Sequence, residues 1–166
     1  FTFLNEQNKS LIVLYNMIQN VLIIVVTFLT MEFVAWFSHK YIMHGFLWRW
    51  HKDHHQPNHQ HFFEKNDLFF LIFAIPSWLG IMFGMLDGFD FKLYIGLGIL
   101  AYGIAYFLIH DIIIHKRFKW FASSDNLYIN GIRKAHKIHH KCTEKEHCEN
   151  FGMLIVPLKY ILKRSL

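Results

Sequence analysis

The sequence predicts an all-α integral membrane protein, with three apolar helices that cross the bilayer and a histidine-rich helical cap on one side. Three observations lead to this fold class. Hydrophobic residues make up 54% of the 166 residues and charged residues only 17%, which is too apolar for an ordinary soluble domain. The apolar residues gather in three long runs, and ten of the 13 histidines fall in two similarly spaced sets. The length is that of one domain, 1–166.

The first apolar run, Leu11–Phe37, predicts a membrane-spanning helix, since about 20 apolar residues cross the bilayer core. Its one charged residue is Glu32, and an ionisable side chain inside a span is costly unless it has a purpose. Glu32 precedes His39 by seven residues, so both face the same way on a continuous helix. We interpret Glu32 as a carboxylate that orients a ligand histidine. Alternatively, it reaches the lipid headgroups near the end of the span.

Two further apolar runs predict the second and third spans. Leu68–Leu86 contains Pro76, which a membrane helix tolerates where its neighbours satisfy the freed carbonyl group. A tight polar connection, 87–90, leads to the third run, Phe91–Ile114. Three glycines in the third run favour close helix contact: Gly96, Gly98 and Gly103. The C-terminal run 151–162 is short for a span, so we interpret it as interfacial or re-entrant, with a fourth span as the alternative.

The positive charges predict which side of the membrane carries the histidines. With three spans, the segments after the first and third runs lie on the same side. Of the 17 Lys and Arg residues, only Lys9 and Lys92 fall on the opposite side, which leaves 15 with the histidines. The positive-inside rule makes that side cytoplasmic. The net charge of +5 therefore indicates topology and contact with anionic membrane lipid, not a nucleic-acid partner.

The histidines carry the strongest functional signal. Each set is an H-x-x-x-x-H pair followed by an H-x-x-H-H triplet; the members are His39, His44, His51, His54 and His55, then His110, His115, His136, His139 and His140. On an ideal helix the second and third members of a triplet lie within about 60° of the first, so all three can face one site. The members of a pair lie about 140° apart. A pair therefore needs a crevice between helices or a helix that unwinds, and Gly45 after His44 is a plausible stop.

Ten imidazoles exceed the four ligands of a usual zinc site, but they supply up to five ligands to each of two metal ions. Imidazole binds both iron and zinc, so ligand type does not choose between them. A lone histidine usually binds no metal, and we favour that interpretation for the three outside the pattern: His59, His61 and His147. The two cysteines, Cys142 and Cys148, are too few for a disulfide framework, and we interpret them as free thiols.

Other side chains border the predicted site. Asp111 beside His110 is a further candidate for orienting a ligand histidine. Asn66 and Asp67, before the second span, are similar candidates, although they can instead cap a helix. Four tryptophans near the ends of the spans are typical of an interfacial aromatic belt: Trp36, Trp48, Trp50 and Trp120.

Residues beyond the histidine spacing carry a family resemblance. Over roughly residues 20–158 the chain resembles the bacterial β-carotene hydroxylases, within the membrane fatty acid hydroxylase superfamily. The strings that carry it are HKYIMHG (39–45), FEKNDL (63–68), AYGIAYFLIHD (101–111), AHKIHH (135–140) and CENFGML (148–154). The chain departs from the family pattern at Asn150, where Ser is usual, and at 56–61; neither departure touches the ten histidines.

The resemblance implies a histidine-bound pair of iron ions that uses O2 to hydroxylate C3 of the β-ionone rings of β-carotene. The product would be zeaxanthin, formed through β-cryptoxanthin. The carotenoid substrate and the enzyme would lie in the inner membrane of a bacterium. The sequence has no G-x-G-x-x-G fingerprint and no cysteine set for an iron–sulfur cluster. External electrons would therefore come from a separate donor, such as ferredoxin with its reductase, which a basic face suits.

Two alternatives remain. A fatty acyl or sterol hydroxylase or desaturase of the same superfamily would use the same metal chemistry, and only the strings outside the histidine pattern favour a carotenoid substrate. A non-catalytic metal-binding or metal-transport protein is the second alternative. A transporter would place polar ligands near the middle of its spans, whereas these histidines lie at the ends of the spans and beyond them.

Overall fold

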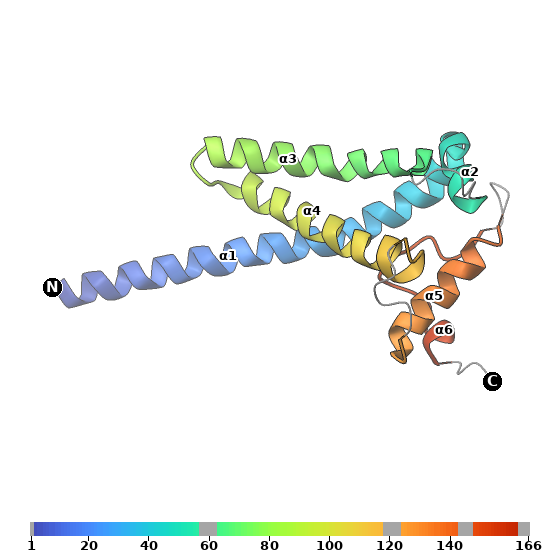
Figure 1. The fold of residues 1–166 in the computed structure, drawn as a ribbon. Helices are drawn as coiled ribbons and strands as arrows, with labels where there is room; N and C mark the ends of the chain where they lie inside the picture. Colours follow the sequence, from blue (N-terminus) through green and yellow to red (C-terminus); the bar gives the residue numbers. More distant parts are fainter. Residues whose placement is uncertain (1, 57–62, 118–123, 143–147, 163–166) are drawn as a thin grey trace.

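The computed structural model describes residues 2–56, 63–117, 124–142 and 148–162, and this part of the chain is all-helical, without a strand (Figure 1). His59, His61, Trp120 and His147 lie outside the described residues. The elements in order are α1 (Thr2–Phe37), the π-helix η1 (Ser38–Phe46), α2 (Trp48–His55), the 3₁₀ helix η2 (Lys65–Phe70), α3 (Leu71–Leu86), α4 (Phe91–Phe107), the π-helix η3 (Leu108–Ile114), α5 (Leu127–His139) and α6 (Leu158–Leu162).

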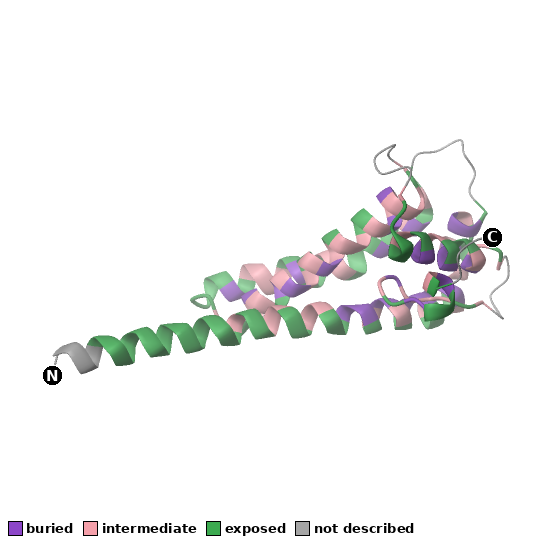
Figure 2. Cartoon of the chain, turned by 90° about the horizontal axis from the view of Figure 1, so that it is seen from below, coloured by how far each residue is buried: buried purple, intermediate pink, exposed green. Residues whose placement is uncertain are grey.

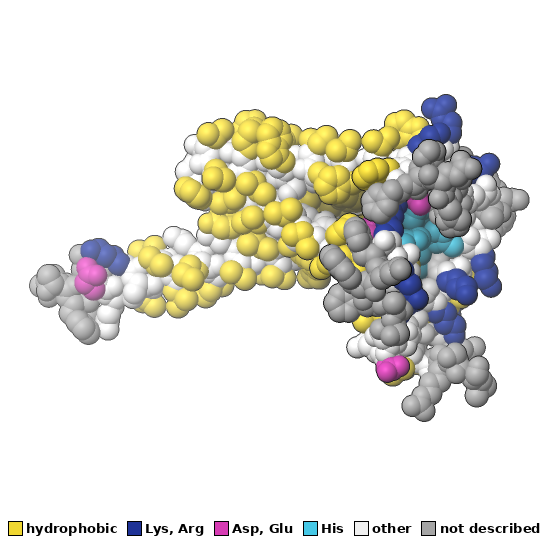
Figure 3. Space-filling view, viewed as in Figure 1, with side chains coloured by type: hydrophobic (Ala, Val, Ile, Leu, Met, Phe, Trp, Pro, Cys, Tyr) yellow, Lys and Arg dark blue, Asp and Glu magenta, His cyan; other side chains and the backbone are white. Residues whose placement is uncertain are grey.

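The three predicted spans are confirmed. Helices long and apolar enough to cross a membrane cover Glu6–Phe46, Lys65–Leu86 and Phe91–Ile114. Their outward faces carry large apolar side chains (Figure 3), and residues 6–19 of α1 are all exposed (Figure 2). A soluble helix has a polar face toward water, which these helices lack, so the fold is that of a membrane protein.

Both histidine-bearing helices lie at one end of the spans, as the count of three crossings predicts. Figure 1 shows α2 and α5 together at the end opposite to the N-terminus and to the α3–α4 turn. That turn is tight, with positive φ angles at Gly88 and Phe89. Asp90 caps α4, because its carboxylate accepts a hydrogen bond from the backbone N–H of Lys92 at 3.0 Å.

Close helix contact at the glycines of α4 is confirmed at two positions of three. A Cβ atom on Gly96 would lie 2.6 Å from the backbone nitrogen of Ile81 in α3, and one on Gly98 would lie 2.6 Å from Cβ of Thr27 in α1. Only glycine permits these approaches. The prediction for Gly103 is wrong, because a Cβ atom there would meet nothing within 4 Å.

The C-terminal residues belong to the cap. The only helix in the described residues 148–162 is α6, whose five residues are far too few to cross a bilayer. Val156 and Tyr160 of this region pack with Ile132 and Ala135 of α5 in a small apolar core. The described chain therefore has no fourth span.

Candidate metal centre

Both H-x-x-x-x-H pairs coincide with π-helical segments. His39 and His44 lie in η1, and His110 and His115 lie in η3 and at its C-cap. In a π-helix each N–H bonds to the carbonyl five residues back, so residues i and i+5 are stacked one turn apart. The backbone N–H of His115 donates to the carbonyl of His110 in this way, at 2.9 Å. The helices that carry the H-x-x-x-x-H pairs therefore widen where the sequence predicted that they unwind. The φ and ψ angles of η1 depart from helical values at Gly45, the predicted stop.

The histidines form two clusters. Five of them bring ring nitrogens within 4.8 Å of one another in cluster A: His39, His44, His51, His55 and His139. Four do the same in cluster B: His54, His110, His115 and His136. His140 adjoins cluster B, because its Nε2 atom lies 2.8 Å from Nε2 of His136. All ten predicted ligands are therefore gathered at one end of the spans.

The triplets do not each face one site, so that expectation is wrong. In α2, His51 and His55 belong to cluster A, whereas His54 belongs to cluster B. In α5, His136 is in cluster B with His140 beside it, whereas His139 belongs to cluster A. Residues i and i+4 of a helix share a face, and the residue between them at i+3 is turned aside by about 60° from the first. The histidine rings of α2 and α5 meet across the site, with centroids 4.7 Å apart for His55 and His139 and 4.6 Å apart for His54 and His140. The middle histidine of each triplet therefore reaches the other cluster.

Hydrogen bonds at the outer nitrogen fix several of the imidazole rings. In cluster A, Nδ1 of His51 lies 2.6 Å from Oδ1 of Asn66. In three other rings Nδ1 faces a main-chain carbonyl: His39 at Phe151 (3.0 Å), His55 at Cys142 (2.7 Å) and His139 at Glu149 (2.7 Å). In cluster B, the acceptors are carboxylates: Glu64 at 2.9 Å from His54 and Asp111 at 3.3 Å from His110. These acceptors take the single N–H of a neutral imidazole, which leaves the lone pair of Nε2 facing inward.

The distance between the inward-facing Nε2 atoms indicates whether a metal cation fits between them. Nε2 of His51 and Nε2 of His55 lie 3.1 Å apart, although both rings use their N–H at Nδ1. Burial lowers the pKa of His51 to about 2 and that of His55 to about 4, so both rings stay neutral. Two lone pairs that face each other at this distance repel unless a cation lies between them. Neutral buried imidazoles in this arrangement fit a transition-metal ion.

The acidic and amide candidates occupy different places. Asp111 contacts His110 as predicted, and Arg117 holds its other oxygen at 3.2 Å. Asn66 orients His51, as predicted for a residue that supports a ligand. Asp67 instead caps a helix, because its carboxylate accepts a hydrogen bond from the backbone N–H of Glu64 at 3.0 Å. Sequence reasoning missed Glu64, whose signal was its place in the string FEKNDL. It also missed Arg117, which binds both Asp67 and Glu64.

Glu32 does not orient a histidine directly, and it does not reach toward the headgroups. Its side chain is buried, and Oε2 accepts a hydrogen bond from the hydroxyl of Tyr102 at 2.7 Å. Oε1 accepts three backbone N–H bonds of 2.9 to 3.0 Å, from Met153, Leu154 and Ile155. Glu32 therefore anchors the segment 148–155, which in turn supplies the carbonyls that orient His39 and His139.

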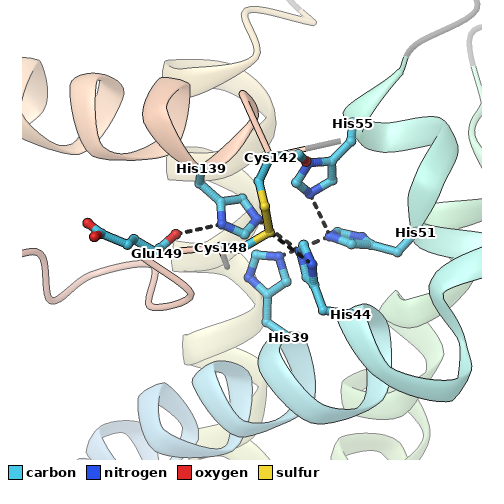
Figure 4. Close-up of a disulfide and its surroundings, with 8 residues drawn as sticks. All are labelled: His39, His44, His51, His55, His139, Cys142, Cys148 and Glu149. Carbon is cyan, nitrogen blue, oxygen red and sulfur yellow. Dashed lines mark hydrogen bonds between the residues drawn. A yellow bond between two sulfur atoms is a disulfide. The ribbon is translucent and has the colours of Figure 1, made fainter. Parts of the chain in front are cut away.

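The cysteines are joined, so the interpretation as free thiols is wrong. Cys142 and Cys148 form a disulfide with Cα atoms 5.5 Å apart, and Figure 4 shows it beside the histidines of cluster A. Sγ of Cys148 lies 3.5 Å from Nδ1 of His44. A count of two cysteines cannot reveal this pairing, because it depends on where the fold places Cys148 relative to Cys142.

An apolar cavity of about 420 Å³ lies between α1, α3 and α4 and reaches both clusters. His39 of cluster A and His110 of cluster B form part of its wall. The ring of Tyr106 stacks on His110 with 4.9 Å between centroids, and it also lines the cavity. Trp48, assigned to an aromatic belt from the sequence, packs on His44 at 5.0 Å instead. Polar side chains line the histidine end of the cavity, but most of its surface is apolar, as is typical of a small-molecule site.

Comparisons with known proteins agree with this geometry. The family described as fatty acid hydroxylase matches residues 24–163. The chain is 41% identical over 140 residues to a β-carotene hydroxylase of Pantoea ananas, which covers 84% of this chain and 79% of that protein. It is 38% identical over 148 residues to a β-carotene hydroxylase of a Paracoccus species, which covers 89% and 90%. The chloroplastic β-carotene 3-hydroxylase 1 of Arabidopsis thaliana is 35% identical over 133 residues, or 76% of this chain and 41% of the plant protein. No solved structure matches the chain.

Proposed function

The chain belongs to the fatty acid hydroxylase family, and on that premise we propose that it is a carotenoid hydroxylase that adds a hydroxyl group at C3 of the β-ionone rings of β-carotene. The product is zeaxanthin, formed through β-cryptoxanthin. One observation carries the proposal: an apolar cavity between membrane-spanning helices has a histidine of each cluster in its wall. A hydrocarbon ring that enters from the bilayer would therefore lie against both clusters.

We assign one iron ion to each cluster. Cluster A would hold its ion with five imidazoles, and cluster B with four together with His140 beside them. When bound, this iron would activate O2 with electrons from a separate donor, which supplies an oxidant strong enough for an unactivated ring C–H bond. No further cofactor is needed in the proposal.

The chain's own groups position the rings and exclude water. The acceptors at Nδ1 hold six of the ten imidazoles with their lone pairs inward. Tyr102, Tyr106 and Phe73 make the cavity wall beside the histidines apolar, so a hydrocarbon ring displaces water from it. Asp111 bonds to His110 and Arg117, and all three residues line the cavity.

We place the cap in the cytoplasm, on the inner membrane of a bacterium. In the cap, an exposed lysine directly follows each of three proposed ligands: Lys52 after His51, Lys137 after His136 and Lys141 after His140. Figure 3 shows Lys and Arg gathered around the histidine end. This positive charge suits an acidic electron donor such as ferredoxin, which its own reductase would reduce. It also suits anionic lipid headgroups.

The test is pigment analysis of cells that accumulate β-carotene, with and without this chain. We expect mono- and dihydroxylated carotene in cells that express it, and neither in cells that express His139→Ala at the same level in the membrane. An unchanged pigment profile, with iron bound and an electron donor supplied, would refute the carotenoid assignment. Lipid analysis of the same cells would then test the fatty acyl and sterol alternatives.

A further inference from the structure

The cavity is a wedge between α3 and α4 that opens toward the histidines. Near the α3–α4 turn the two helices touch: a Cβ atom on Gly84 would collide with the backbone of Leu93, and one on Gly80 would lie 3.1 Å from Cα of Gly96. Two turns further along α4, nothing lies within 4 Å of a Cβ atom built on Gly103, which lines the cavity. The missing side chain of Gly103 therefore adds room where the helices have separated.

The cavity is too small for a whole carotene. Its lining residues on α4 and η3 run from Tyr102 to Asp111, nine residue steps that rise about 14 Å along a helix. In an extended chain three bonds advance about 3.5 Å, so the nineteen bonds that join the two rings of a carotene hold them about 22 Å apart. The cavity therefore holds one β-ionone ring and the start of the polyene. The remaining carbons of a forty-carbon carotene must lie outside.

The mouth of the wedge provides an apolar place for the rest of the molecule. Phe70 and Ile72 at the start of the α3 span and Phe107 at the end of α4 line the cavity, and their side chains are exposed by 65%, 38% and 46%. All three lie in segments apolar enough to cross the membrane. A polyene that leaves the wedge between them therefore enters lipid and not water.

We propose that the enzyme binds one end of the carotenoid at a time and hydroxylates the two rings in separate binding events, with Gly103 as the residue that makes room for the ring. This inference rests on the proposed function. The far ring lies outside the cavity, so the monohydroxylated carotene must leave, reverse and re-enter. Each event breaks one C–H bond and consumes one O2, two protons and two electrons from the separate donor. It yields one C–OH group and one water.

A trapping experiment tests the separate events. The iron-loaded enzyme is placed in liposomes with an electron donor and isotope-labelled β-carotene, and a tenfold excess of unlabelled monohydroxylated carotene is added once labelled intermediate has formed. By mass action, we expect label in the dihydroxylated product to fall about tenfold, since the released intermediate mixes with the unlabelled pool. Undiminished labelling would show retention and overturn the inference. No hydroxylated product in any form would refute the proposed function instead.

Substitution at Gly103 tests the site itself. Gly103→Leu fills the wedge and should lower turnover of β-carotene at least about tenfold, while bound iron stays unchanged. Gly103→Ala adds one methyl group to open space and should change turnover less than about threefold. Ile104→Phe adds bulk on the neighbouring lipid-facing position and serves as the matched control. Full turnover by Gly103→Leu would overturn the assignment, and so would an equal loss in Ile104→Phe.

Discussion

Clusters A and B use the same ligand chemistry but differ in what surrounds them. The outer nitrogens in cluster A bond to neutral acceptors, three main-chain carbonyls and the amide of Asn66. Those in cluster B bond to the carboxylates of Glu64 and Asp111, which Arg117 links. Cluster A therefore depends on where the fold places Cys142 and residues 148–155, whereas cluster B depends on a network of charged side chains. An anionic acceptor makes an imidazole a stronger donor to a metal, so the two sites should hold iron with unequal affinity.

Loss of a ligand should have the largest effect and would test the exchange between the triplets. His139→Ala should abolish activity and remove the iron of cluster A, because His139 lies in that cluster although it is in the second set by sequence. His54→Ala should abolish activity and remove the iron of cluster B. Iron content per protein and the spectroscopic signal of the iron that remains would measure both effects.

The matched control for these two variants is Lys137→Ala, an exposed neighbour on the same helix as His139. It should retain iron and activity. If His139→Ala and His54→Ala left the same remaining iron signal, the assignment of one histidine from each triplet to the opposite cluster would be wrong.

Removal of the carboxylate charge beside cluster B should have the second-largest effect. Glu64→Gln keeps the shape of the side chain but replaces the anionic acceptor of His54 at 2.9 Å. We expect iron affinity or turnover to fall about 10- to 100-fold, as for other residues that orient metal ligands. Metal titration of the purified protein would measure it. Asn66→Ala, which removes the neutral acceptor of His51, should weaken cluster A instead, and an effect on cluster B would contradict the comparison.

Glu32→Gln should weaken iron binding in cluster A alone, and by less than Glu64→Gln weakens it in cluster B. The substitution removes the charge from three backbone hydrogen bonds that anchor residues 153–155, and this loosens the carbonyls that orient His39 and His139. We expect a loss of turnover of about tenfold, at the low end of such indirect effects. Tyr102→Phe is the matched variant, since it removes the other bond to Glu32 and leaves the backbone bonds in place. Equal loss of iron from both clusters would contradict this role.

Removal of the disulfide should have the smallest effect. In the Cys142→Ser, Cys148→Ser double variant, the two positions are only six residues apart, and short loops gain least from a cross-link. We expect turnover to change less than about threefold, with iron retained in both clusters, as measured in the liposome assay. A loss as large as that of His139→Ala would show that the disulfide, and not the anchoring of residues 153–155 by Glu32, holds the carbonyls over cluster A.

The sequence alone was sufficient for properties that depend on composition and local spacing. The three spans follow from the length and apolarity of their runs, and the structure confirms them. The gathering of ten histidines at one end follows from counting crossings. The family follows from the histidine spacing and the strings around it, and the comparisons confirm it. Each of these can be inferred without knowing which side chains meet in the folded protein.

The tertiary structure decided everything that depends on which distant groups meet. The division of each triplet between two clusters arises because the histidine rings of α2 and α5 meet, a relation that neither helix encodes by itself. The bonds of Glu32 to residues more than 100 positions away, and the main-chain acceptors of His39, His55 and His139, have no residue-type signal, because every residue has a carbonyl and an N–H. The cavity at Gly103 likewise exists only because α3 and α4 touch near their turn and separate toward the histidines.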